Sequence, residues 1–305
     1  MDEIKKVLIC GIGAIGSIYA DKISRYNHND LKILVDKSRF EHYNKNPTLF
    51  NDKTLDLEYI LPDNKDFKAD LIIIATKFDG LDKVIKDLSN FIKDDTIILS
   101  LLNGVMSEKL IAQTYGAEKL LYSYFIGHSA MREGRKITHD DVNKIVFGTD
   151  SELDMTNQEL IKKYFEKVGI NYEIPDDIIH SIWLKFMLNV SANQTSALLR
   201  LTFKEMLDDI KCKKLLEDIM LEVQEIAKAE GVKNTENMIS QTFDNLGLMI
   251  PNGKTSMLQD IEANRITEVE IFAGTVIELG KKHNIKTPIN AMLYTLINIA
   301  QDKKS

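Results

Sequence analysis

A lysine and two asparagines recur at steps of four residues in the second half of the chain, as Lys185, Asn189 and Asn193. On a helix this spacing gives one slowly turning polar stripe, here among apolar neighbours such as Trp183 and Phe186. An ammonium can donate a proton to a carbonyl oxygen, and two amides can orient the rest of a small substrate. The stripe therefore indicates either a carbonyl-binding site or the solvated face of an ordinary surface helix.

A second chemical signal is the segment 7–16, where an apolar strand enters a Gly-x-Gly-x-x-Gly turn and then a helix over 14–26. Gly11 permits the tight turn, Gly13 admits a pyrophosphate close to the backbone, and Gly16 lets the helix pack on the strand. The free amides of the helix then face the anion. The alternative is a plain glycine-rich turn. The residues that we expect to bind a dinucleotide here are Gly11, Ile12, Gly13, Ala14, Ile15 and Gly16.

The end of the second expected strand bears on the choice of cofactor. Asp36 follows the glycines at the distance where an acid usually binds the ribose hydroxyls of NAD. Lys37 and Arg39 come directly after it and can hold the 2′-phosphate of NADP instead. We expect NADP(H), with NAD possible because of Asp36.

Four further polar residues lie at the ends of expected elements. Lys77 and Asn103 each follow a strand, where open α/β sheets bind their ligands, although a turn lysine and an Asn-Gly turn are the ordinary alternatives. Ser256 with Gln259 has the spacing of a capping box, which also places the serine at a helix end that favours a carboxylate. Glu268 alone is typical of a solvated helix face.

The composition limits the class of protein. The 305 residues are 44% hydrophobic and 28% charged, with a net charge of −7, which suits a soluble enzyme and disfavours nonspecific binding to nucleic acid. No signal sequence or membrane-spanning run is visible, so a cytoplasmic protein is expected. Cys10, Cys212 and the six histidines show no metal-ligand spacing, and we predict no metal site.

The sequence pattern of the first half of the chain predicts a doubly wound α/β sheet. Apolar runs without polar alternation, such as Leu71–Ala75, suggest strands that are covered on both faces. Residues 135–139 and 144–147, joined by 140–143, look like a hairpin that gives the sheet a mixed edge. The other expected strands are 7–10, 32–35, 96–101, 120–125 and 145–147.

The sequence pattern of the second half predicts an all-helical domain. A helix over 158–168 is followed by the breaker Gly169 and by Pro175, which predicts a Rossmann-type domain over 1–174 and a helical domain over 175–305. The apolar faces of the later helices can pack internally or against a second copy, so a homodimer is possible. The expected helices are 178–199, 203–231, 235–246, 256–264, 268–284 and 289–302.

Taken together, these motifs resemble the ketopantoate reductase family over nearly the whole chain. The motifs that carry the resemblance are the glycine turn, Thr76-Lys77, Leu102-Asn103-Gly104, Trp183-x-Lys185 with Asn189 and Asn193, Ser256 to Asp260, and Thr267-Glu268. The resemblance implies a Rossmann domain joined to a helical domain. It also implies NADPH-dependent reduction of 2-dehydropantoate to (R)-pantoate in pantothenate biosynthesis, in the cleft between the two domains.

The resemblance also implies a role for each matching residue. Lys185 is expected to donate the proton, while Asn189, Asn193 and Ser256 hold the substrate. One departure is Phe203, which stands where the family has a substrate-contacting asparagine. The residues expected along the nicotinamide end of the cofactor are Lys77, Asn103, Ala130 and Glu268.

Two other functions stay open at this point. Phe203 keeps reduction of another small 2-oxo acid as an alternative. A noncatalytic dinucleotide sensor is less consistent with the chain, because it has no need for the lysine and asparagine stripe.

Overall fold

The computed structural model describes residues 1–127, 131–139, 142–151 and 155–302. The chain forms two compact units. The first unit comprises Met1–Asn103 and Ser107–Ile178, and the second comprises Gly104–Met106 and Ile179–Ser305. The boundary predicted after residue 174 falls shortly before the end of the first unit. Ala130, one of the residues expected to contact the cofactor, lies outside the described residues.

The first unit is built on a sheet of eight strands among the described residues, in the order β12-β11-β8-β7-β6-β1-β2-β5. From β5 to β8 every neighbouring pair is parallel, and β1 lies between β2 and β6. This is the strand order of Rossmann domains. The antiparallel pair β8·β11 gives the predicted mixed edge. The strands are β1 (Val7–Cys10), β2 (Leu31–Leu34), β5 (Tyr59–Ile60), β6 (Leu71–Ile74), β7 (Ile97–Ser100), β8 (Leu120–Gly127), β11 (Asn143–Gly148) and β12 (Tyr172–Glu173).

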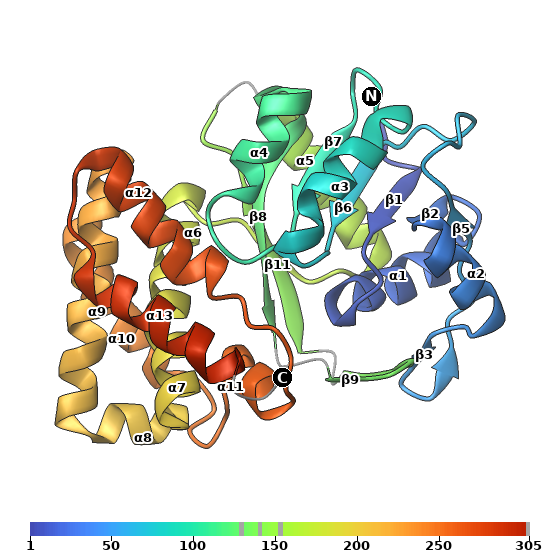
Figure 1. The fold of residues 1–305 in the computed structure, drawn as a ribbon. Coiled ribbons are helices and arrows are strands. Elements are labelled where there is room, and N and C mark those ends of the chain that lie inside the picture. Colours follow the sequence, from blue (N-terminus) through green and yellow to red (C-terminus); the bar gives the residue numbers. More distant parts are fainter. Residues whose placement is uncertain (128–130, 140–141, 152–154, 303–305) are drawn as a thin grey trace. The chain divides into compact units, whose positions relative to one another are not determined.

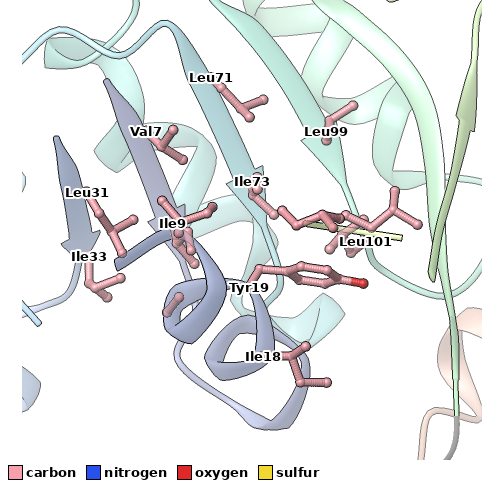
Figure 2. Close-up of a cluster of buried hydrophobic side chains, with 14 of the residues drawn as sticks. Val7, Ile9, Ile18, Tyr19, Leu31, Ile33, Leu71, Ile73, Leu99 and Leu101 are labelled. Carbon is pink, nitrogen blue, oxygen red and sulfur yellow. The ribbon is translucent and has the colours of Figure 1, made fainter. Parts of the chain in front are cut away.

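Apolar side chains project from both faces of the central strands, as the unbroken apolar runs predict. Ile9 and Ile73 point to the face that carries Tyr19, whereas Leu8 and Ile72 belong to the core of the other face (Figure 2). Helices α1 and α5 contribute to the first core, and α3 and α4 to the second (Figure 1). The helices of this unit are α1 (Ala14–Asn27), α2 (Lys37–Lys45), α3 (Leu81–Asp87), α4 (Ser107–Tyr115) and α5 (Met155–Val168).

The predicted hairpin over 135–147 is wrong. Its first strand, β10 (Lys136–Thr138), joins a separate sheet of order β4-β3-β10-β9, while β11 pairs with β8. The reason is a distant partner: β10 runs parallel to β3 (Leu49–Phe50), and Ile137 is buried in the same core as Phe50. The other strands of this sheet are β4 (Lys53–Thr54) and β9 (Met131–Glu133).

The second unit is helical, as predicted. Two of its long helical segments contain a π-helical turn, at Asn189–Asn193 and at Glu270–Gly274. None of the described helices combines the length and the apolarity that crossing a membrane requires. The helices are α6 (Ile178–Leu188), α7 (Gln194–Leu199), α8 (Phe203–Asp208), α9 (Ile210–Ala229), α10 (Met238–Gly247), α11 (Ser256–Glu262), α12 (Thr275–His283) and α13 (Pro288–Asp302) (Figure 1).

Candidate active site

The glycine turn between β1 and α1 has the geometry that its sequence predicts. Gly11 has φ +100°, and a Cβ there would lie 2.7 Å from the carbonyl oxygen of Ala75. A Cβ on Gly16 would lie 1.9 Å from the carbonyl oxygen of Gly11, so the helix packs on the turn without room for a side chain. By contrast, no described atom outside its neighbours lies within 4 Å of a Cβ built on Gly13. The N-terminus of α1 therefore has a compact base and an open approach, which fits a pyrophosphate.

The residues between these glycines have two roles: some anchor the turn in the hydrophobic core, and others form the start of α1. Ile12 is buried in the core of the first unit, and Ile15 packs against that core. Ala14 begins α1, and Gly13 caps it without a side chain. The start of this helix thus has no side-chain cap, which leaves its positive end open to an anion.

The acid after β2 is already engaged in the start of the next helix. Asp36 caps α2: its Oδ1 accepts from the Arg39 amide at 2.9 Å and from the Ser38 hydroxyl at 2.8 Å. The hydrogen bond from the Arg39 amide is the main cause that holds the pKa of Asp36 below its usual value, so the carboxyl is ionised. The guanidinium of Arg39 lies 3.6 Å from the same carboxylate, and Lys37 is exposed beside it. A negative charge and two cations therefore share this helix terminus.

Lys77 and Asn103 lie at the same edge of the sheet as the glycine turn. Lys77 follows β6 and Asn103 follows β7. β6 pairs with β1, β7 pairs with β6, and all three strands are parallel. Lys77 is exposed and Asn103 is half-buried. The carboxyl ends of parallel strands are where such sheets bind ligands, so the topology brings both residues to the edge that the sequence predicted.

In the second unit, the polar stripe passes through a π-helical turn. α6 carries Lys185, and the turn Asn189–Asn193 begins directly after that helix. The Asn193 amide donates to Asn189 Oδ1 at 3.3 Å, and the two residues are only 6% and 8% exposed. The two amides are therefore partnered within the protein interior and do not form a solvated face. π-Helical turns inside α-helices are frequent at functional sites.

The sequence did not reveal the π-helical turn or the residues beneath it. Gln194 donates to the carbonyl oxygen of Val190 at 2.7 Å and contacts Asn290 at 3.4 Å. Asn290 in turn donates to Glu222, which also accepts from the amides of Ile289 and Asn290 at the start of α13. The only signal for this network is the presence of polar residues in otherwise apolar helix faces.

Lys185 has an altered protonation equilibrium. The residue is half-buried, and its removal from water lowers its pKa to about 8, while the nearby charge of Glu268 opposes the shift. Glu268 is itself half-buried and lies just before the π-helical turn Glu270–Gly274. The carboxylate thus has an electrostatic partner in the same unit, which the solvated-face interpretation of Glu268 did not anticipate.

The predicted capping box at Ser256 is wrong by one residue. Thr255 has the extended conformation of an N-cap and accepts from the Leu258 amide at 3.3 Å, whereas Ser256 is the first residue of α11. Gln259 donates to the carbonyl oxygen of Lys254 rather than closing a box. Because Thr255 is available as the cap, the Ser256 side chain stays exposed at the helix N-terminus.

Phe203 lies against the loop that leads to Ser256. Its amide donates to the carbonyl oxygen of Gly253 at 3.3 Å, and its ring carbon Cδ2 is 3.5 Å from where a Cβ of Gly253 would be. Phe203 begins α8 after a complete capping box formed by Thr202 and Glu205. The aromatic ring is therefore held beside the same segment as Ser256.

A Rossmann sheet with a glycine-rich turn after β1, followed by helices that carry a lysine of lowered pKa, is typical of a dinucleotide-dependent oxidoreductase. Residues 7–152 match the family model "Ketopantoate reductase PanE/ApbA", and residues 177–301 match "Ketopantoate reductase PanE/ApbA C terminal". The chain therefore belongs to the ketopantoate reductase family.

Individual relatives span nearly the whole chain. A 2-dehydropantoate 2-reductase of Streptococcus pyogenes is 28% identical over 96% of each chain. The structure of D-mandelate dehydrogenase with NADH and anilino(oxo)acetate has a TM-score of 0.86 at 24% identity and covers 98% of each chain. A dimeric ketopantoate reductase from Staphylococcus aureus has a TM-score of 0.77 at 21% identity over 98% of this chain and 100% of its own. The solved structures share the fold of this chain.

The glycine turn yields a test that separates folding from ligand binding. We expect Gly16→Ala to destabilise the protein by about 1–3 kcal/mol or more, because the new Cβ meets a backbone oxygen that cannot move freely. Gly13→Ala has space for its Cβ and should unfold at the wild-type temperature, yet weaken cofactor binding by obstructing the approach to the amides. Thermal unfolding and fluorescence titration with reduced cofactor measure the two effects. Equal destabilisation by both substitutions would contradict this account of the turn.

Proposed function

We propose that this protein is a 2-dehydropantoate 2-reductase that uses NADPH to form (R)-pantoate. The observation that carries the proposal is the half-buried Lys185, with its pKa lowered to about 8, on the same helical segment as Asn189 and Asn193. The Streptococcus pyogenes relative and the family membership support the choice of substrate. By analogy with the family, the reaction serves pantothenate biosynthesis in the cytoplasm, and a homodimer remains a prediction.

In this mechanism the chain's own residues handle charge and protons. Bound NADPH supplies the hydride that the keto carbon receives. As the carbonyl oxygen becomes an alkoxide, the ammonium of Lys185 stabilises it and then donates the proton, after which the neutral amine regains a proton from water. Glu268 favours the charged form of Lys185 and so helps to keep this proton donor protonated near neutral pH.

The remaining site residues bind and orient. Asn189 and Asn193 offer amide donors and acceptors to the substrate, and their mutual hydrogen bond sets the orientation of both side chains. Ser256 lies at the N-terminus of α11, where a substrate carboxylate is electrostatically favoured. Along the cofactor, we assign Gly11 to Gly16 to the pyrophosphate, and we assign Ala130 to the nicotinamide end by family resemblance alone. Lys77, Asn103 and Glu268 are assigned to the nicotinamide end.

Removal of the Lys185 amine tests the proposed chemistry. We expect Lys185→Ala to lower the turnover of 2-dehydropantoate by about 10²–10⁴-fold while cofactor still binds, because the proton donor is lost. In the wild type, kcat/KM for reduction should fall as the pH rises above about 8, since the protonated form of Lys185 is the donor and its pKa lies there. Steady-state rates between pH 6 and 10 measure both effects.

Lys228→Ala is the matched control, because Lys228 is a lysine of α9 paired with Glu225 and should leave turnover unchanged. Near-normal turnover in Lys185→Ala would remove Lys185 from the mechanism. Tight cofactor binding by the wild type without turnover of any 2-oxo acid would favour the dinucleotide sensor instead.

The preference for NADPH has its own test at α2. Arg39 and Lys37 support binding of a 2′-phosphate, whereas the ionised Asp36 opposes it. We expect a higher kcat/KM with NADPH than with NADH, and we expect Arg39→Ala to lower the NADPH value about tenfold with little effect on NADH. Lys45→Ala, an exposed lysine at the far end of the same helix, serves as the control. A clear advantage of NADH in the wild type would reverse the assignment.

A second candidate function is reduction of a more apolar 2-oxo acid. The specific observation is that Phe203 presents a ring, not an amide, next to the loop before Ser256. The D-mandelate dehydrogenase that shares this fold was solved with anilino(oxo)acetate, an anion that carries an aromatic ring next to its carbonyl and carboxylate groups. A phenyl ring in contact with the substrate would favour an apolar side chain over the hydroxyl group of 2-dehydropantoate.

Exchange of this side chain distinguishes the two substrates. If Phe203 contacts the substrate, Phe203→Asn should shift the ratio of kcat/KM for 2-dehydropantoate over 3-methyl-2-oxobutanoate at least about tenfold toward 2-dehydropantoate, because an amide can pair with the hydroxyl. Phe243→Asn, a half-buried phenylalanine of α10, should leave the ratio unchanged. An unchanged ratio in Phe203→Asn as well would show that Phe203 does not select the substrate.

A further inference from the structure

A buried carboxyl group outside the proposed chemistry lies at the start of α4. Glu108 is 6% exposed, and burial raises its pKa to about 7. The Ser107 hydroxyl donates to Glu108 Oε2 at 2.8 Å, and the backbone amides of Glu108 and Ser123 also donate to this carboxylate. A carboxylate in the first turn of a helix is favourable, but burial of its charge is costly unless hydrogen bonds compensate for it.

The carboxyl group is one end of a chain of hydrogen bonds between three elements. Ser100, the last residue of β7, donates to Ser107 at 2.9 Å, and Ser123 of β8 donates to the carbonyl oxygen of Ser100 at 2.9 Å. All three serines are at most 1% exposed. We call Glu108, Ser107, Ser100 and Ser123 the serine–glutamate network.

The serine–glutamate network contains the two residues that flank the segment 101–106, which are Ser100 and Ser107. Residues 101–106 run between Ser100 and Ser107, and this segment contains Asn103. Gly104–Met106 belong to the helical unit, where Gly104 lies beside Ile271. The segment therefore begins after the last residue of β7 and ends before the first residue of α4. The serine–glutamate network joins these two points.

We propose that Glu108 is a positioning residue that fixes the segment 101–106, and with it Asn103, for binding of the nicotinamide dinucleotide. This inference rests on the proposed function, in which Asn103 contacts the cofactor. Glu108 acts through Ser107 and Ser100 and touches no reacting atom. Small displacements of a binding group cost large factors in affinity or rate, so loss of this anchor affects ligand binding beyond its effect on folding.

The experiment measures cofactor affinity directly, by fluorescence titration of the full chain with NADPH and NADH. We expect Glu108→Ala to weaken binding about tenfold, which corresponds to the coupling found between residues in one network. Glu108→Gln keeps an acceptor oxygen and resembles the protonated carboxyl group that the raised pKa favours at pH 6, so it should bind within about twofold of the wild type at that pH.

Asp70→Asn is the matched control for stability. Asp70 is also a buried acid of the first unit, but it accepts from the amides of Lys5 and Lys6 and pairs with Lys93, next to the start of β6 rather than after a strand end. This variant should lower the unfolding temperature and leave cofactor affinity unchanged. Ser100→Ala gives a milder disruption of the serine–glutamate network, and its effect should not multiply with that of Glu108→Ala, because the two residues act through one chain of bonds.

Wild-type affinity in Glu108→Ala, or in Ser100→Ala if the first variant does not fold, would overturn the positioning role. Equal weakening by Asp70→Asn at the same loss of unfolding temperature would overturn it too, because the effect would then be general destabilisation. Absence of binding of either cofactor by the wild type would instead reject the proposed function. The two failures are therefore distinguishable.

Discussion

The site of the second unit depends on one electrostatic constraint, which is that an ammonium is held partly out of water close to a single carboxylate. Burial makes the charged form of Lys185 costly and lowers its pKa to about 8, while the charge of Glu268 opposes this shift. A lysine in solution holds its proton too firmly at neutral pH to be an effective acid. The surrounding apolar helix faces are needed to bring this lysine within reach of physiological pH.

Two π-helical turns explain how this unit assembles its polar residues. One turn lies just after Lys185 and holds Asn189 and Asn193, and the other follows Glu268. Each widening of the helix redirects side chains that a regular α-helix would carry to other faces. The buried bonds among Gln194, Asn290 and Glu222 lie next to the first turn and support its departure from regular geometry.

Much of the fold could be predicted from the sequence because its signals are local. The strand 7–10 and the glycine turn were predicted at the residues where they occur, and the unbroken apolar run from Leu71 is a strand with both faces covered. The predicted hairpin failed because β10 takes its parallel partner from residues 49–50, and no local pattern encodes a pairing over that separation. Ser256 was wrongly assigned as an N-cap because serine and threonine both serve as N-caps, and the sequence does not show that Thr255 has the extended backbone of the cap.

The first unit of the chain is interrupted by the short stretch Gly104–Met106, which is part of the helical unit. Division of the chain at residue 178 therefore does not separate two complete bodies. A fragment that starts at residue 179 lacks the backbone of Gly104, which lies beside Ile271 in the intact chain. The helical unit is therefore built from two separate stretches of the chain, and we expect it to need both of them in order to fold.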